Sequence, residues 1–140
     1  MIKTFKGSLA GGDQERSRLG TTQGKVGYKI VDFRTMLADP MDASGKSVVK
    51  AYVREQSSVV NSIDFTESDL LAVSVLSHST TSGAGTFNLI VFDNNVVNQD
   101  IYITACANPG PVNYYLELET ITLTEQGAEY TTIKDLRANA

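Results

Sequence analysis

Short apolar runs rich in Val, Ile, Thr, Tyr and Phe recur along the chain, and clusters of Gly, Asn, Asp, Ser and Pro separate them. Runs of this kind are typical of antiparallel β-strands joined by turns. The predicted strands cover residues 2–9, 15–20, 27–37, 47–55, 70–78, 86–92, 100–107 and 112–124. Their number and spacing favour an all-β fold of about eight strands, an antiparallel β-sandwich of the jelly-roll type, with residues 1–140 in a single domain.

Alternation within the runs assigns the two faces of each strand, because successive side chains of a strand point to opposite sides. Residues 48–54 show this most clearly, with apolar residues on one face and mainly charged residues on the other. The first face holds Val49, Ala51 and Val53, and the second holds Lys50, Tyr52 and Arg54. The same reasoning predicts a core that contains Tyr28, Ile30, Val49, Val53, Val73, Leu89, Val91, Ile101, Ile103, Leu116 and Leu118.

Two strands depart from simple alternation. Residues 86–92 are apolar on both faces, which indicates that a second layer or a partner subunit covers one of them. In the last strand Leu116 and Leu118 share one face, whereas Ile121 and Leu123 have the opposite parity. Such a phase change indicates a bulge or a strand that moves from one surface to another. Both features leave more apolar surface than one small core requires, and they predict a homo-oligomer.

Two segments have helical character. Residues 66–69 resemble a helix cap, but the β-branched run that follows limits them to one helical turn. Residues 124–137 place acids in the first turn and Lys134 and Arg137 in the last, which is compatible with a short C-terminal helix.

Charge is unevenly distributed. The first 54 residues carry ten bases and five acids, a net charge of +5, and the remaining 86 carry two bases and eleven acids, a net charge of −9. Such a chain can pair its own ends or join neighbouring copies head to tail. Residues 1–12 are compatible with an extended arm hinged at Gly11 and Gly12. The candidate assembly interface comprises Lys3, Lys6, Arg16, Arg18, Ile90, Phe92, Glu117, Glu119, Ile121 and Leu123.

No catalytic, cofactor-binding or metal-binding residue emerges, and the chain is not predicted to be an enzyme. Residues 40–47 end like a phosphate-binding loop, but Pro40 replaces the first glycine and a strand follows. His78 and Cys106 lack the local frame of a nucleophilic site. The Asn- and Asp-rich residues 93–100 lack EF-hand spacing. Glu117 and Glu119 stand roughly 7 Å apart on one strand face, but beside them Tyr115 is the nearest aromatic residue, which disfavours a glycosidase and leaves carbohydrate binding open.

Composition limits the partners further. A net charge of −4 disfavours binding to nucleic acid, and no stretch approaches the ~18 apolar residues of a membrane span. A single cysteine and the lack of a signal peptide favour synthesis in a reducing cytoplasm.

Several phrases of the sequence resemble small, uncharacterised virion-type structural proteins of environmental, mainly marine, tailed bacteriophages. They occur at residues 1–7, 27–31, 89–94, 98–104, 113–119 and 131–137, so that the resemblance spans most of the chain. It implies a structural role in a virion and assigns no catalytic residue.

The leading hypothesis is therefore a capsid decoration or cement subunit that associates with itself and with a phage capsid protein, made in the bacterial host cytoplasm and located in the virion. Two alternatives remain: a receptor- or carbohydrate-binding module on the virion, and a self-assembling shell or tube protein.

Overall fold

The computed structural model describes residues 2–18, 26–39, 45–78, 85–92, 96–97, 99–108 and 110–122. These residues form eight strands and no helix, which confirms the predicted fold class. The strands are β1 (Ile2–Leu9), β2 (Asp13–Ser17), β3 (Val26–Leu37), β4 (Lys46–Tyr52), β5 (Leu70–His78), β6 (Gly85–Val91), β7 (Ile101–Asn108) and β8 (Val112–Thr122). The helix expected at residues 124–137 lies outside the described residues.

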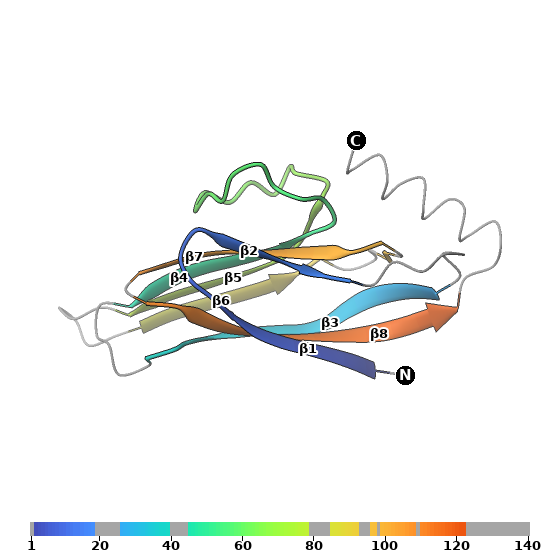
Figure 1. The fold of residues 1–140 in the computed structure, drawn as a ribbon, viewed down its shortest axis with the longest axis horizontal. Helices are drawn as coiled ribbons and strands as arrows, with labels where there is room; N and C mark the ends of the chain where they lie inside the picture. The colour runs from blue at the N-terminus through green and yellow to red at the C-terminus, as the bar shows by residue number, and fades with distance from the viewer. Residues whose placement is uncertain are drawn as a thin grey trace.

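The strands form two antiparallel sheets that pack face to face (Figure 1). One has the order β1-β8-β3 and the other the order β2-β7-β4-β5-β6. In a jelly roll a long antiparallel ribbon wraps on itself, so that first and last strands pair, then second and seventh, third and sixth, and fourth and fifth. Three of these pairs are present, β1 with β8, β2 with β7 and β4 with β5. The fold is thus a jelly roll with one incomplete pair.

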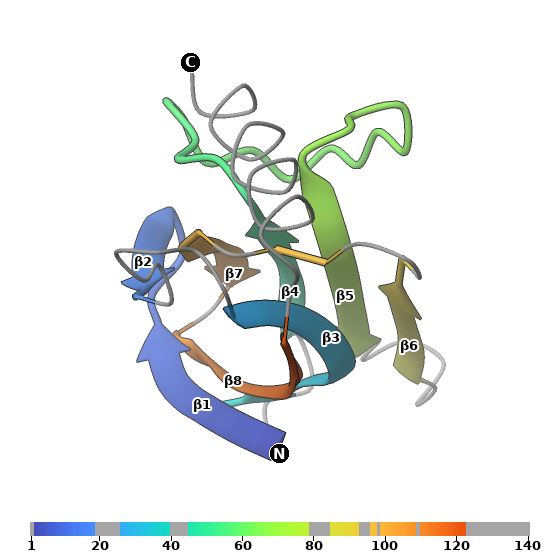
Figure 2. The same ribbon diagram turned by 90° about the vertical axis from the view of Figure 1, so that its right-hand side faces the viewer.

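The incomplete pair is β3 with β6. The two strands contact each other, but β6 is hydrogen-bonded to β5, and β3 is hydrogen-bonded to β8. Viewed end-on in Figure 2, β6 ends the larger sheet on the side where β3 ends the smaller one. Val97, between β6 and β7, bridges one point of this boundary through two backbone hydrogen bonds with Tyr28 of β3. We call the boundary between the two sheets the seam.

A one-residue bulge interrupts β3. Ile30 lies opposite Leu118 and Asp32 opposite Glu117, so that Val31 is the extra residue. Tyr28 and Ile30 face the core before the bulge, and Phe33 and Leu37 face it afterwards, on positions of opposite parity. The sequence predicted an irregularity in the last strand; in the structure the extra residue belongs to its neighbour.

The core lies between the sheets and matches the prediction closely. One predicted residue, Val73, is buried instead on the outer face of the larger sheet, opposite Lys50. Eight of the other ten are buried in the core, and Leu89 and Val91 are partly buried against it. Side chains that the alternation did not single out complete it, among them Phe33, which is fully buried, and Leu9, Val97 and Val112. Both sheets therefore contribute large apolar residues to one continuous core.

The outer face of β4 differs from the prediction. Lys50 and Tyr52 were assigned to a solvent-facing, charged surface, yet each is only 2% exposed. The segment 53–69 folds over this face of the larger sheet (Figure 1) and brings the carbonyl oxygen of Ser62 to 2.8 Å from Lys50 Nζ. The aliphatic stem of a lysine packs well in such a layer, but its amine then needs a hydrogen-bond acceptor.

Polar contacts fix both ends of this segment. The backbone of Gln56 exchanges hydrogen bonds with the side chain of Gln14 on β2. The backbone nitrogen of Gln56 donates to Gln14 Oε1, and Gln14 Nε2 donates to the backbone carbonyl oxygen of Gln56. Gln56 Nε2 also donates to Asp69 Oδ2, which pairs with Arg54 at 3.2 Å. Asp64 closes a turn by accepting from the Thr66 amide. Residues 66–69 therefore form turns and no helix.

The N-terminal residues form a strand, not a free arm. β1 pairs with β8 along all eight residues, and Phe5 and Leu9 pack on or in the core. Gly11 and Gly12 form a tight turn into β2. Gly12 has φ 89°, and its backbone nitrogen donates to the carbonyl oxygen of Ala105. A Cβ on Gly11 would lie 2.5 Å from the carbonyl oxygen of Ala107. This turn cannot serve as the expected hinge.

Leu116 tests the face assignment of β8, because it is fully buried at the centre of the smaller sheet. We expect Leu116→Ala to lower the free energy of unfolding by about 2–5 kcal/mol through lost burial and the cavity it leaves. Chemical denaturation monitored by circular dichroism measures this loss. Ile2→Ala, at an exposed position of the same sheet, is the control and should change stability by less than about 0.5 kcal/mol. Similar losses in both variants would contradict the assignment.

Candidate functional site

The outward face of β1, β8 and β3 carries a row of two cations and an aromatic ring. Lys6 of β1 and Arg34 of β3 both lie directly opposite Tyr115 of the central strand. All three residues are exposed, and Tyr115 presents 37% of its surface. Because neighbouring strands are about 4.8 Å apart, the two cations flank the ring from backbones about 10 Å apart. We call these three residues the cationic row.

The rows on either side have different chemistry. Toward one end of the sheet, Ser8, Asn113 and Met36 lie side by side, with Met36 62% exposed. Toward the other end, Glu117 lies opposite both Thr4 and Asp32. The cationic row is thus bounded on one side by neutral residues and on the other by carboxylates.

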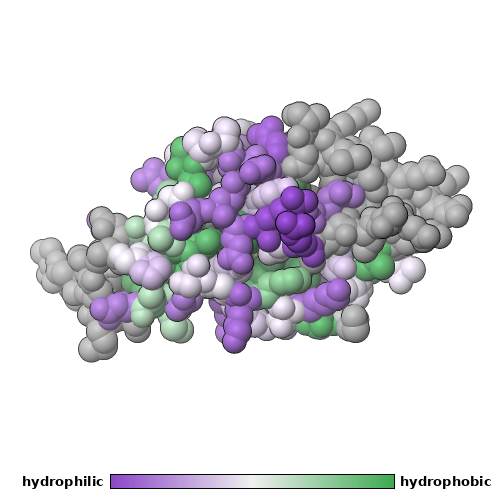
Figure 3. Space-filling model, in the orientation of Figure 1, coloured by the Kyte–Doolittle hydropathy of each residue, from purple (hydrophilic) through white to green (hydrophobic). Residues whose placement is uncertain are grey.

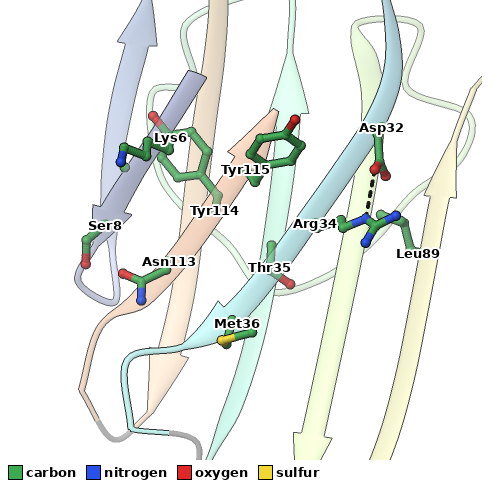
Figure 4. A pocket seen from close by; sticks show the side chains of 11 residues that line it. Lys6, Ser8, Asp32, Arg34, Thr35, Met36, Leu89, Asn113, Tyr114 and Tyr115 are labelled. Atoms are coloured by element: carbon green, nitrogen blue, oxygen red, sulfur yellow. Dashed lines mark hydrogen bonds and ion pairs between the residues drawn. The ribbon is translucent and has the colours of Figure 1, made fainter. Parts of the chain in front are cut away.

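These residues surround a broad open depression of about 1070 Å³. Figure 4 shows Lys6 and Ser8 along one side, Tyr115 and Asn113 on the central strand, and Arg34 and Met36 on the other side. The depression extends beyond β3 to Leu89 of β6, and so reaches the seam. It is the candidate functional site, and its lining comprises Lys6, Gly7, Ser8, Asp32, Arg34, Thr35, Met36, Leu89, Asn113, Tyr114 and Tyr115.

An ion pair orients Arg34. Its Nε donates to Asp32 Oδ2 at 2.7 Å, two residues away on the same face of β3. The Arg34 side chain remains 73% exposed. Its Nε is bonded to Asp32, and the rest of the guanidinium faces solvent. A guanidinium in this position can bind a carboxylate or sulfate with two parallel hydrogen bonds.

Tyr114 supports the site from beneath. It faces inward from β8, and a Cβ on Gly7 would lie 2.8 Å from its ring and hydroxyl and 2.9 Å from Glu15 Oε2. A larger residue at position 7, which lies opposite Tyr114 in the ladder, would therefore have to displace the Tyr114 ring and the Glu15 carboxylate. Burial raises the pKa of Tyr114, and the nearby Glu15 carboxylate raises it further.

The predicted assembly residues do not form one surface. Lys6, Glu117 and Glu119 lie on the outward face of the smaller sheet, but Lys3 has the inward parity and places its amine 5.5 Å from the centroid of the Tyr28 ring. Ile121 is half-buried near the end of β8, and Leu123 lies outside the described residues.

Four further residues from the prediction belong to the larger sheet. Arg16 and Arg18 are exposed, on β2 and just after it. Ile90 is exposed on β6, and Phe92 follows that strand and makes an edge-to-face contact with Phe65 at 5.1 Å between ring centroids. The structure therefore divides the predicted interface between two sheets.

Two ion pairs join the basic N-terminal third to later acids. Arg16 pairs with Asp100, which raises the pKa of the arginine, and Arg54 pairs with Asp69. Pairing within one fold, the alternative to head-to-tail contacts, thus accounts for part of the charge asymmetry.

The described residues cover the other candidate sites only in part. A strand follows Lys46 and Ser47, as the sequence predicted, while residues 40–44 lie outside the described residues, as do residues 93–95 and 98. Cys106 is half-buried on β7 with its thiol free. The described residues contain no group of three or more His, Cys, Asp and Glu that could hold a metal ion.

The sequence argument named two members of the cationic row, Lys6 as a candidate assembly residue and Tyr115 as an outward aromatic residue, but it did not join them into one site. It noted Tyr115 but not Arg34, because strict alternation from Tyr28 and Ile30 places Arg34 in the core. A signal was present: the apolar positions of β3 change parity between Ile30 and Phe33. That change marks the bulge that turns Arg34 outward.

Comparison of the chain with models of protein families, with curated proteins and with solved structures finds no match. Among the described residues, no helix is long and apolar enough to cross a membrane.

The buried Tyr52 makes the free energy of unfolding depend on pH in the alkaline range. Burial, together with the Glu67 and Asp69 carboxylates, raises the pKa of Tyr52 from 10 to about 12. The unfolded chain therefore ionises first, and the stabilisation from the neutral phenol is lost as the pH rises from 10 to 12. We expect the free energy of unfolding of the parent protein to fall over this pH range. The free energy of unfolding of the Tyr52→Phe variant should fall less steeply. Parallel slopes in denaturant titrations at several alkaline pH values would contradict a buried phenol.

Proposed function

We propose that the protein is a non-enzymatic structural subunit that associates with copies of itself, as a capsid decoration or cement protein of a bacteriophage particle. The observation that carries the assembly part is the chemistry of β6 at the seam. β6 is an edge strand with the sequence GTFNLIV, which contains neither a charged residue nor proline.

Edge strands usually carry features that prevent pairing with other chains, such as charges, prolines or bulges. The other three edges follow this pattern. β1 contains Lys3 and Lys6, β2 contains an arginine and two acids, and β3 contains Arg34 and the bulge. β6 lacks these features, and in the described part of the chain no strand is hydrogen-bonded to its second edge.

Exposed apolar side chains lie on the same sheet as this edge. Ile90 of β6 is 40% exposed, and the segment 53–69 on the outer face of the sheet exposes Val60, Ile63 and Phe65. Phe65 reaches the end of β6 through its contact with Phe92. An uncharged edge with apolar neighbours suits an interface whose centre is dry.

The partner that fits this edge is a second copy of the chain. An antiparallel pair of identical strands is related by a two-fold axis, so β6 can pair with its own copy without any other complementary sequence. The two larger sheets would then join into one continuous sheet. We expect the interface to bury at least ~1,000 Å² in total, the lower range for specific association.

The placement in a phage particle rests on the sequence phrases that resemble virion-type proteins of marine tailed phages, and the jelly-roll fold is compatible with it. A closed shell or a tube built from the same chain would use the same edge, with a second contact elsewhere. Electron micrographs of the concentrated protein distinguish dimers or small rings from tubes and shells. Immunogold labelling of purified particles from a phage that carries the gene tests the virion location.

Ile90→Lys tests the β6 edge. It places a charge on the proposed interface at a position that the isolated subunit already exposes, so we expect the monomer to fold normally and the dissociation constant of the assembly to rise about ten-fold or more. Sedimentation equilibrium measures this change.

Ile2→Lys is the matched control, since it makes the same substitution at a 49% exposed position on the edge of the other sheet. It should leave assembly unchanged. A parent protein that stays monomeric at high concentration, or equal effects of the two substitutions, would rule out the β6 interface.

A further inference from the structure

The depression on the smaller sheet is a site for an acidic saccharide: we propose that it binds a sugar ring on Tyr115 and a carboxylate or sulfate group of that sugar through Lys6 and Arg34. This inference does not rest on the β6 interface, because the proposed ligand contacts Lys6, Tyr115 and Arg34 belong to β1, β8 and β3, and only Leu89 at the border of the depression belongs to β6.

The cationic row supplies the recognition of negative charge. Lys6 and Arg34 lie directly opposite Tyr115 in the strand register, one on each neighbouring strand, and Arg34 makes an ion pair with Asp32 at 2.7 Å. A neutral sugar would leave these two cations without a ligand group to bind. An anionic substituent can form charge-assisted hydrogen bonds with the ammonium or with the guanidinium.

Tyr115 and the neutral row supply the recognition of a ring with hydroxyl groups. Tyr115 stands exposed on the central strand and presents an amphipathic ring to the depression. Beside it, Asn113 offers an amide and Ser8 a hydroxyl, and Met36 adds an apolar rim. An aromatic platform with convergent neutral polar groups is the usual chemistry of a site for a polar ring.

Two features argue against other anionic ligands. A polyanion such as single-stranded nucleic acid would continue along the strands, where Glu117 and Asp32 repel it on one side of the cationic row. A peptide that binds by adding a strand to the sheet needs a free sheet edge. The site is centred on β8, whose backbone already pairs with β1 and β3. The charge that fits is therefore compact and belongs to one or two sugar units.

Figure 3 shows one side of the molecule, where hydrophilic residues cover the middle of the visible surface and hydrophobic residues form small separate patches.

Short oligogalacturonate is the first probe, and its methyl ester is the matched neutral ligand, since the two differ only in the carboxylates. A chondroitin sulfate oligosaccharide tests sulfate as the anionic group. We expect isothermal titration calorimetry at low ionic strength to detect binding of at least one acidic probe, with an affinity at least ten-fold higher than that of the methyl ester, and to show that added salt weakens it.

The variants assign the binding to the site. Arg34→Ala should weaken binding about ten-fold or more, and Tyr115→Ala roughly five-fold. Lys46→Ala removes an exposed lysine on the other sheet and should leave the affinity unchanged. Ile90→Lys should also bind normally, which separates this inference from the assembly. Circular dichroism confirms that each variant is folded.

Three results would overturn the inference. The first is no binding of either acidic probe, and the second is equal binding of oligogalacturonate and its methyl ester. The third is tighter binding of a short single-stranded oligonucleotide that is lost in Arg34→Ala and Tyr115→Ala, which would identify the row as a nucleic-acid site.

Discussion

The bulge at Val31 determines what both faces of the smaller sheet can do. One extra residue in β3 reverses the parity of every side chain after it, so that Phe33 and Leu37 enter the core and Arg34 and Met36 point to solvent. Without it, the same strand would bury an arginine and expose a phenylalanine, which is unfavourable on both counts. The core and the cationic row therefore depend on one local irregularity of the backbone.

The seam follows from the way in which the strands pair. Three of the four strand pairs of a jelly roll are present, but β6 is hydrogen-bonded to β5 and not to β3. This leaves an uncharged strand at the end of the larger sheet, and it extends the depression as far as Leu89. The proposed assembly edge and the border of the proposed saccharide site thus arise from the same break in the ribbon.

A covering layer gives the larger sheet a different character. The segment 53–69 buries the outer face of β4, including the Lys50 amine, whose pKa is lowered by desolvation. The amine retains a hydrogen bond to the Ser62 carbonyl oxygen, so this layer satisfies a buried donor as well as adding apolar cover. The smaller sheet has no comparable segment over the cationic row in the described part of the chain, and its outward side chains stay exposed.

The sequence alone determined the eight strands, most of the core and the β-sandwich class, because a period of two in apolar side chains is a local property of each strand. It also named Ile90 as a candidate assembly residue, because residues 86–92 are apolar on both faces. It could not place Lys50, because alternation within the strand does not show that the following segment, 53–69, folds back over that face. Nor could it join Lys6, Arg34 and Tyr115, which are far apart in sequence and meet only through the pairing of β1 and β3 with β8. Register across strands is decided by tertiary packing, and here it decides the site.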